Sequence, residues 1–162
     1  MKECRALELN TKGRYAVTAM ADLAKFGGAE AVPLSAVAER QQISLAYLEQ
    51  LFVKLRRAGL VESARGRSGG YRLARPAALI TVAEVMRAVD EGLRMTRCGG
   101  EEAVPCMAGK RCLTHGLWDA LSDRIGSFLE SVNLQEVIDG ISPLQKPRMA
   151  QPSMTPERFI TE

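Results

Sequence analysis

The residues most capable of chemistry lie together in one short stretch of the chain. Three of its four cysteines, Cys98, Cys106 and Cys112, and its only histidine, His115, fall within eighteen residues. Thiolates and an imidazole are the ligands that zinc, copper and iron–sulfur clusters prefer. The glycines between them let the backbone turn back on itself, as a loop around a metal requires. The sequence therefore predicts a metal centre here. The alternative is a loop of unrelated thiols beside a surface histidine.

Two kinds of metal centre use this set of donors. A structural zinc site with three cysteines and one histidine has the same ligands, but it usually contains a Cys-x₂-Cys knuckle. This stretch has only Cys112-x₂-His115, and its longer spacings favour a wider, two-iron cluster. The spacing favours iron–sulfur and leaves zinc open. The fourth cysteine, Cys4, is interpreted as a free thiol near the N-terminus.

Length and composition limit the class of protein. The 162 residues suit one domain, or one small domain with an appendage, and a hydrophobic content of 46% suffices for a packed core. No apolar run is long enough to cross a membrane, and no signal peptide is recognisable at the N-terminus, so we expect a cytoplasmic protein. Residues 1–75 contain 13 basic and 7 acidic side chains, a net charge of +6. This basic half is a candidate for binding a polyanion.

Helical signals in the basic half predict a helix-turn-helix. Apolar residues recur at helical spacing over residues 11–26, and a short helix is expected after Pro33. Ser44 is a good N-cap for a third helix that runs to about Arg57. Its expected buried side consists of Leu45, Leu48, Phe52 and Leu55. Its expected projecting side consists of Ala46, Tyr47, Glu49, Gln50, Val53, Lys54 and Arg57.

A β-hairpin is expected directly after the third helix. Residues 60–64 and 71–74 read as strands around a loop rich in glycine and arginine. A hairpin in this position is a wing, and its tip carries Arg65 and Arg67, which suit a narrow minor groove. An amphipathic core helix followed by a solvated turn would explain each feature singly. The combination, in this order and on the basic half, favours binding to double-stranded DNA, with Lys54 and Arg57 of the helix and Arg65 and Arg67 of the wing among the expected contacts.

The second half is expected to hold the ligands and a dimer contact. Thr81 and Glu84 form a capping box that opens a fourth helix, with Gly92 expected to end it, and a loop over residues 93–111 follows. A long helix is expected from about Leu113 to Val132. Its seam is Trp118, Leu121, Ile125, Phe128 and Val132. Such a seam packs on its own domain or on a second copy, and we favour a homodimer. A short final helix should begin near Asn133.

The expected fold class is therefore mainly α with a small β wing: a winged helix-turn-helix domain plus a long dimerisation helix. Four parts are expected along the chain. They are an N-terminal extension (1–10), the winged helix-turn-helix domain (11–78), the cluster-binding loop with the dimerisation helices (79–140), and a mobile tail (141–162).

Three stretches carry a resemblance to a known family. TKGRYAVTAM at 11–20, ISLAYLEQLFVKLRRAGLVESARGRSGGYRL at 43–73 and RCLTHGLW at 111–118 resemble the IscR family of iron–sulfur regulators, which are dimeric winged-helix transcription factors. The similarity covers about residues 8–140. It implies that the protein senses iron–sulfur clusters, binds DNA and represses the genes for cluster assembly, with the iron–sulfur assembly machinery as its cluster source.

The resemblance also implies roles for particular residues. The ligands of a 2Fe–2S cluster map onto Cys98, Cys106, Cys112 and His115. The base-contacting residues map onto Tyr47, Glu49 and Gln50 of the third helix and Arg65 of the wing.

Two departures from the family pattern keep alternatives open. Cys98 and Cys106 have seven residues between them, more than the family usually has, and Ala46 stands where a serine is common. A related repressor that responds to nitric oxide or iron remains an alternative, as does a DNA-binding regulator with structural zinc. An enzyme is not expected, because no catalytic constellation remains once the only histidine is assigned as a ligand.

Overall fold

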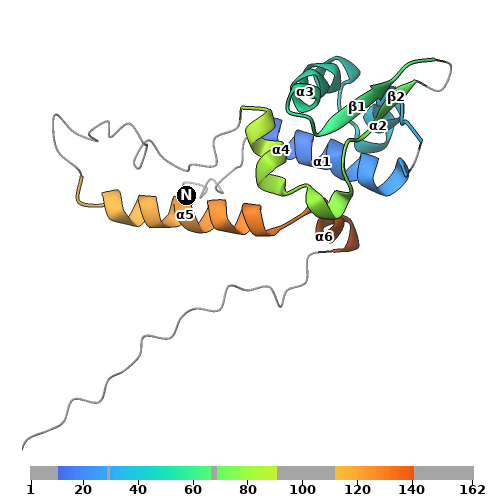
Figure 1. Cartoon of the computed structure of the whole chain (residues 1–162). Helices are drawn as coiled ribbons and strands as arrows, with labels where there is room; N and C mark the ends of the chain where they lie inside the picture. The colour runs from blue at the N-terminus through green and yellow to red at the C-terminus, as the bar shows by residue number, and fades with distance from the viewer. Residues whose placement is uncertain (1–10, 29, 67–68, 91–111, 141–162) are drawn as a thin grey trace, which may run out of the picture.

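The chain forms a helical domain with one hairpin and one helix that projects from it (Figure 1). The computed structural model describes residues 11–28, 30–66, 69–90 and 112–140. Along these ranges the elements are α1 (Thr11–Phe26), α2 (Leu34–Gln41), α3 (Leu45–Arg57), β1 (Val61–Ala64), β2 (Gly70–Leu73), η1 (Ala77–Leu79), α4 (Val82–Ala88), α5 (His115–Ser131) and α6 (Leu134–Asp139). The fold is mainly α with a two-stranded wing, as the sequence predicts.

Helices α2 and α3 form the predicted helix-turn-helix. α2 ends at Gln41, and the next residue, Gln42, has a left-handed backbone (φ 55°) that makes the tight turn. The Gln42 N–H donates to the Ala38 carbonyl. Ser44 then caps α3, because its side chain accepts a hydrogen bond of 3.2 Å from the backbone N–H of Tyr47. The buried side chain of Ile43 holds the turn against the core.

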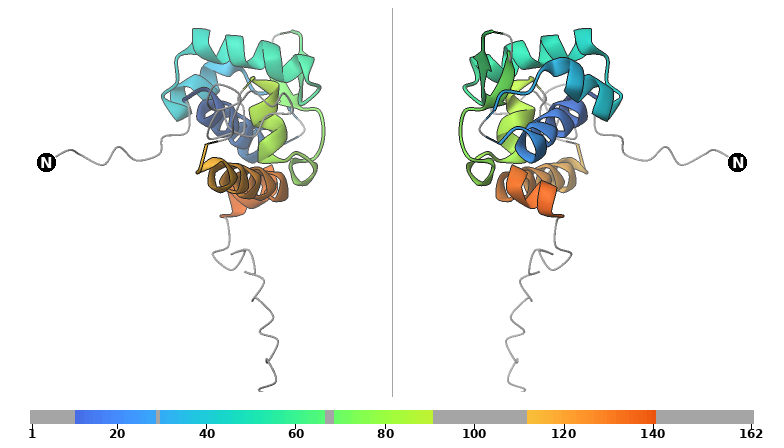
Figure 2. Two further views of the ribbon diagram at one scale, coloured as in Figure 1. Left: turned by 90° about the vertical axis from the view of Figure 1, so that its left-hand side faces the viewer. Right: turned by 90° about the vertical axis from the view of Figure 1, so that its right-hand side faces the viewer.

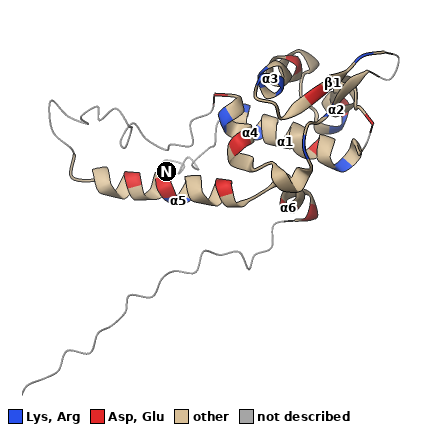
Figure 3. Cartoon of the chain, in the orientation of Figure 1, with Lys and Arg blue, Asp and Glu red and all other residues tan. Residues whose placement is uncertain are grey.

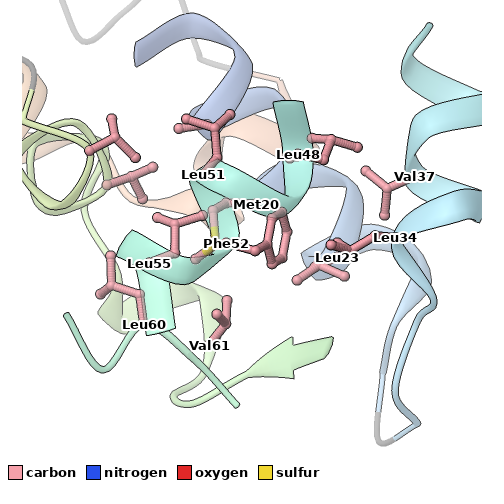
Figure 4. Packing of buried hydrophobic residues seen from close by; sticks show 14 of the residues in the cluster. Met20, Leu23, Leu34, Val37, Leu48, Leu51, Phe52, Leu55, Leu60 and Val61 are labelled. Carbon is pink, nitrogen blue, oxygen red and sulfur yellow. The ribbon is translucent and has the colours of Figure 1, made fainter. Parts of the chain in front are cut away.

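The main core lies between α1, α3 and α4 (Figure 4). Its largest fully buried side chains include Met20 and Leu23 of α1 and Leu48, Phe52 and Leu55 of α3. One expectation for α3 is wrong. Leu45 is 42% exposed, and Leu51, one turn and a half further along, is buried in its place. The core stripe of α3 therefore begins at Leu48 and leaves the first turn of the helix on the surface.

The hairpin forms the wing and is attached to the domain by backbone pairing. β1 and β2 are antiparallel, with Val61 opposite Leu73 and Ala64 opposite Gly70. Val32, in the connection between α1 and α2, exchanges two hydrogen bonds of 2.8 Å with Tyr71. Gly70 sits against this bridge so closely that a Cβ atom there would lie 2.3 Å from the Val32 carbonyl oxygen. The glycine therefore permits the wing to pack on the linker.

Helix α4 begins and ends within a few residues. Both halves of the predicted capping box are present, since Thr81 accepts from the Glu84 N–H and Glu84 accepts from the Thr81 N–H. The expected end at Gly92 is wrong for the helix itself, which stops at Ala88, and Asp90 follows in the left-handed region (φ 59°). Val89 is fully buried and ties this end of α4 to the core.

Helix α6 returns to the domain after α5. Asn133 caps it with a second capping box, and Val82 N–H donates to the Val132 carbonyl at 2.9 Å. The Leu134 N–H donates to the Ile80 carbonyl at 3.0 Å, and the Leu134 side chain is fully buried in the main core. The predicted start of this helix near Asn133 is confirmed. It packs against α1 and η1.

Helix α5 projects from the domain (Figures 1 and 2). Several of its large apolar side chains are exposed. The expected single seam is partly wrong. Val132 is buried within the same chain, and Leu129 packs beside it against Val82 and Met86 of α4. The large apolar side chains of α5 that stay at least one-third exposed are Leu117, Trp118, Leu121 and Phe128, and Leu113, just before the helix, is exposed too. The helix thus has one apolar strip that packs on its own domain and another that the described residues leave uncovered.

Several sequence predictions lie outside the described residues. They are the N-terminal extension (1–10) with Cys4, Arg67 at the wing tip, Gly92, the loop over residues 93–111 with Cys98 and Cys106, and the tail (141–162). Within the described ranges, no helix is both long and apolar enough to cross a membrane.

Candidate DNA-binding surface and ligand site

The exposed side of α3 forms one face of the domain. Glu49, Gln50 and Arg57, three residues predicted to contact DNA, all have exposed side chains there. Figures 1 and 2 place α3 and α5 on opposite sides of α1. In the described part of the chain, Arg57 has no ion-pair partner. This face can therefore approach a polyanion without obstruction by the projecting helix.

Tyr47 sits at the edge of this face and is half-buried. The ring of Tyr15, from α1, packs against it edge-to-face, with ring centroids 5.9 Å apart and an interplanar angle of 85°. α1 thereby restricts the rotamers open to Tyr47. Tyr47, which is predicted to contact a base, therefore packs against α1, a helix outside the helix-turn-helix.

Lys54 is paired within the chain. Its ammonium donates to the carboxylate of Asp90, just after α4, and Lys12 of α1 lies 3.9 Å from the same oxygen. The hydrogen bond between the two side chains raises the pKa of Lys54 and lowers the pKa of Asp90. The structure therefore places this predicted DNA contact at the edge of the α3 face, with a carboxylate already bound to it.

The wing places Arg65 on the surface, where the described residues offer no ion-pair partner. The neighbouring Arg72 differs, because it forms an ion pair of 2.8 Å with Glu62 directly across the hairpin. Figure 3 shows where the charged residues lie along the ribbon. Basic residues occur on α3, whereas α5 carries mainly acidic ones. The charges thus favour the α3 and wing side for contact with phosphates.

A buried carboxylate fixes the helix-turn-helix on α1. Asp22 has a fully buried side chain, and it accepts hydrogen bonds from Arg40 Nε at 3.0 Å and from Gln41 Nε2 at 2.7 Å. The Asp22 hydrogen bond raises the pKa of Arg40, and the Arg40 guanidinium also lies 4.7 Å from the ring centre of Phe26. These contacts set the angle at which α2, and through it α3, leaves α1.

Cys112 and His115 lie together in the turn that opens α5. The His115 backbone N–H donates to the Cys112 carbonyl at 3.1 Å, and the Thr114 hydroxyl lies 3.6 Å from the Cys112 sulfur. The Trp118 indole N–H donates to the same hydroxyl at 3.2 Å, which orients it. Both Cys112 and His115 are half-buried rather than enclosed in the core. The turn therefore places a thiol and an imidazole close together near the surface of the domain.

The other two predicted ligands, Cys98 and Cys106, lie outside the described residues. Among the described residues, no group of three or more histidine, cysteine, aspartate or glutamate side chains is placed to hold a metal. The structure thus brings Cys112 and His115 together, while the relation of this pair to the two other cysteines stays a prediction.

Sequence reasoning missed three contributors to these sites. Asp90 and Tyr15 act on the α3 face from other elements, and Asp22 acts from beneath it. A carboxylate at position 22, on the apolar side of α1 and three residues from Ala19, was the one available signal. A charge inside an apolar stripe is rarely buried unless it is paired. Asp90 and Tyr15 carried no such signal, because their partners are distant in sequence.

Comparison with known proteins shows similarity along most of the chain. The family model described as "Rrf2: Iron-dependent Transcriptional regulator" matches residues 9–140. The HTH-type transcriptional regulator IscR of Xenorhabdus nematophila is 56% identical over 132 residues, which is 82% of this chain and 79% of the relative. IscR of Yersinia pseudotuberculosis is 53% identical over 133 residues, 82% of this chain and 80% of the relative.

Solved structures agree with this fold. T. potens IscR superposes with a TM-score of 0.68 at 37% identity, covering 89% of this chain and 93% of that one. CymR (YrzC), the global cysteine regulator of B. subtilis, superposes with a TM-score of 0.68 at 32% identity. That match covers 83% of this chain and 98% of CymR.

Proposed function

Because this chain belongs to the Rrf2 family of iron-dependent transcriptional regulators, we propose that it senses iron–sulfur clusters and represses genes for cluster assembly. The chain is an IscR-like helix-turn-helix regulator of transcription and not an enzyme. The proposal adds a cofactor, a 2Fe–2S cluster, with Cys98, Cys106, Cys112 and His115 as its ligands. It also adds a homodimer that receives the cluster from the iron–sulfur assembly machinery.

The observation that carries the proposal is the turn at the start of α5. It holds a thiol and an imidazole three residues apart at the N-terminal end of a 17-residue helix. The partial positive charge of a helix N-terminus favours the net negative charge that iron–sulfur centres with thiolate ligands carry. Both residues are half-buried near the surface, and a thiol with an imidazole is a donor set that suits iron and sulfide. The described half of the site therefore fits the cluster.

When bound, a 2Fe–2S cluster with one imidazole ligand has a higher reduction potential than one with four thiolates, and it offers a ligand that protonation can release. The protein's own residues determine how such a centre is linked to the fold. Cys112 and His115 belong to α5 and the turn that opens it, whereas Cys98 and Cys106 come after α4 in the chain. Ligation by all four residues ties the chain that leaves α4 to the helix that we propose dimerises.

The proposed homodimer rests on the exposed apolar strip of α5. Leu117 is 62% exposed and Phe128 is 42% exposed on a helix that projects from the domain. A projecting helix with an uncovered apolar strip gains stability by packing against a like helix. A two-fold dimer would carry two α3 faces, and so it would read two half-sites on DNA.

The test of the cofactor is metal analysis of protein purified without oxygen. We expect brown protein with about two iron and two sulfide per chain. Replacing a ligand, as in His115→Ala or Cys112→Ser, should lower iron and sulfide retention by more than half. Cys4→Ser is the matched control, because Cys4 lies outside the proposed ligand set, and it should retain the wild-type content.

Other results would identify a different regulator. About four iron per chain would favour the related repressors that respond to nitric oxide or iron. Colourless protein with one zinc ion per chain would contradict the cluster and leave a zinc-containing DNA-binding regulator. A His115→Ala variant with wild-type iron and sulfide would show that the histidine is not a ligand.

A further inference from the structure

Lys54 faces two competing partners. It lies in the last turn of α3, among residues proposed to contact DNA, yet its ammonium is hydrogen-bonded to the carboxylate of Asp90. A lysine cannot neutralise a phosphate fully while its charge is neutralised within the protein. The pair therefore lies where an internal contact and a DNA contact exclude each other.

The position of Asp90 is set by the end of α4. Its backbone N–H donates to the Arg87 carbonyl at 3.0 Å, and its left-handed conformation (φ 59°) turns the chain away from the helix. The preceding residue, Val89, is fully buried. Aspartate and asparagine adopt this conformation more readily than most residues. The domain thus presents the carboxylate toward α3, beside which the end of α4 packs.

The surrounding charges favour exchange of partners. Lys12 lies 3.9 Å from the Asp90 carboxylate, and Arg57 repels Lys54, whereas Arg87 is paired with Glu130 of α5. The side chain of Asp90 is 72% exposed. An ion pair this exposed is weakened by solvent and salt. A phosphate that approaches α3 can therefore displace the carboxylate.

We propose that Asp90 competes with DNA phosphate for Lys54, so that the chain leaving α4 adjusts the affinity of α3 for DNA. The inference rests on the proposed function, because it requires α3 to lie against DNA. Asp90 is the last described residue before the segment that contains Cys98 and Cys106. Asp90 lies eight residues before Cys98 in the sequence. We therefore expect ligation there to change how firmly Asp90 holds Lys54, so that affinity for DNA depends on the ligand state through this contact.

The experiment compares wild type with Asp90→Asn, which removes the charge and keeps the size and the left-handed preference of the residue. The full-length protein is titrated, metal-free and cluster-loaded, against a fluorescent 30-base-pair duplex of mixed sequence at several salt concentrations. This probe reports phosphate contacts and needs no known operator. Glu130→Gln is the matched control, since it removes one carboxylate from an ion pair between α4 and α5 and changes the net charge equally.

We expect Asp90→Asn to bind the duplex more tightly and with a steeper dependence on salt. One additional phosphate contact steepens the slope of log K against log salt by about 0.9 per protomer. The advantage over wild type should then shrink about threefold per protomer between about 50 and 200 mM salt. In a Lys54→Gln background, Asp90→Asn should have no such effect. The difference in affinity between metal-free and cluster-loaded protein should be smaller in Asp90→Asn than in wild type.

Three results would overturn the inference. The first is an equal gain in Asp90→Asn and Glu130→Gln, which indicates net charge alone. The second is an undiminished gain in the Lys54→Gln background. The third is an unchanged difference between the two ligand states in Asp90→Asn, which removes the link to the ligand segment. Failure of the proposed function looks different. Without the DNA-binding role, wild-type protein would show no salt-dependent DNA binding at all, and without the cluster, metal analysis would find no iron and sulfide.

Discussion

Glu49 is an acidic side chain on a face otherwise suited to phosphate. Glu49 is exposed on α3, next to Gln50, and Arg57 is exposed at the end of the same helix. A carboxylate repels phosphates, but it can accept a hydrogen bond from N4 of cytosine in the major groove. We therefore expect Glu49 to lower the general affinity for DNA and to add sequence preference.

Replacing Glu49 with alanine should relax that preference. We expect discrimination between preferred duplexes and their single-base variants to fall about tenfold at the position read by Glu49. Affinity for unrelated DNA should rise. The measurement is binding to duplexes selected from a random pool, with Glu30→Ala as an exposed control outside the helices. If wild type and Glu49→Ala select the same sequences equally well, Glu49 has no role in specificity.

Asp22 matters for stability rather than for contact with DNA. Its buried carboxylate accepts hydrogen bonds from Arg40 and Gln41, so its removal leaves these donors without an acceptor. Asp22→Ala should lower the free energy of unfolding by about 3 kcal/mol. The measurement is urea denaturation, with Glu62→Ala as the control, because the exposed pair of Glu62 with Arg72 is worth less than about 1 kcal/mol. If both variants lost the same free energy of unfolding, burial of Asp22 would not explain its contribution to stability.

At the scale of single elements, the capping box of α4 predicts a dependence of stability on pH. The Thr81 backbone N–H, followed by Arg75, lowers the pKa of Glu84 below its ordinary value. A carboxyl whose pKa is lower in the folded state stabilises the protein above the unfolded pKa of about 4.3. This contribution is lost as the pH falls through the folded value.

Glu84→Gln keeps a side chain that can still cap the helix but removes the titration. Its free energy of unfolding should be lower than that of wild type by up to about 1 kcal/mol at neutral pH, since Glu84 is partly exposed. The difference should shrink below about pH 4. Urea denaturation between about pH 3 and 7 measures it, with Glu30→Gln as the control. A difference that stays constant with pH would rule out a charge effect.

Local signals predicted most elements well. Ser44, the capping box at Thr81 and Glu84, and the glycine-rich hairpin each depend on neighbours in sequence, and all three are confirmed. Burial at the helix ends was harder to predict. Leu45 has the right type and spacing for the core of α3, but it is 42% exposed at the start of the helix, whereas Leu48, three residues later, is fully buried.

The candidate functional surfaces also contain features that the sequence could predict and features that it could not. The exposed positions of Glu49, Gln50, Arg57 and Arg65 follow from the helix period and the hairpin, and so they could be predicted. The pairing of Lys54 with Asp90 could not, because the two residues are 36 positions apart and meet only through the packing of α4 on α3. Helical period also cannot divide one wide apolar arc on α5 into a strip that packs on its own domain and a strip that stays exposed.

For the whole molecule, the exposed strip of α5 predicts assembly. Leu117→Glu or Phe128→Glu would place a charge in the proposed dimer contact, and each should weaken dimerisation at least tenfold. Sedimentation over a range of concentrations measures the dimer dissociation constant, with Asp123→Asn, an exposed position on α5 outside this strip, as the control. Wild-type protein that remains monomeric at about 100 µM would contradict a homodimer formed through α5.

The return of α6 to the core has a consequence for the order of synthesis. Leu134 is fully buried against the first half of the chain, and the backbone near Val132 and Leu134 bonds to residues around Ile80. A nascent chain that has left the ribosome only as far as the wing therefore lacks part of its core. The cysteines and His115 are translated before Leu134. All four predicted ligands have therefore been synthesised before Leu134 can complete the core of the domain.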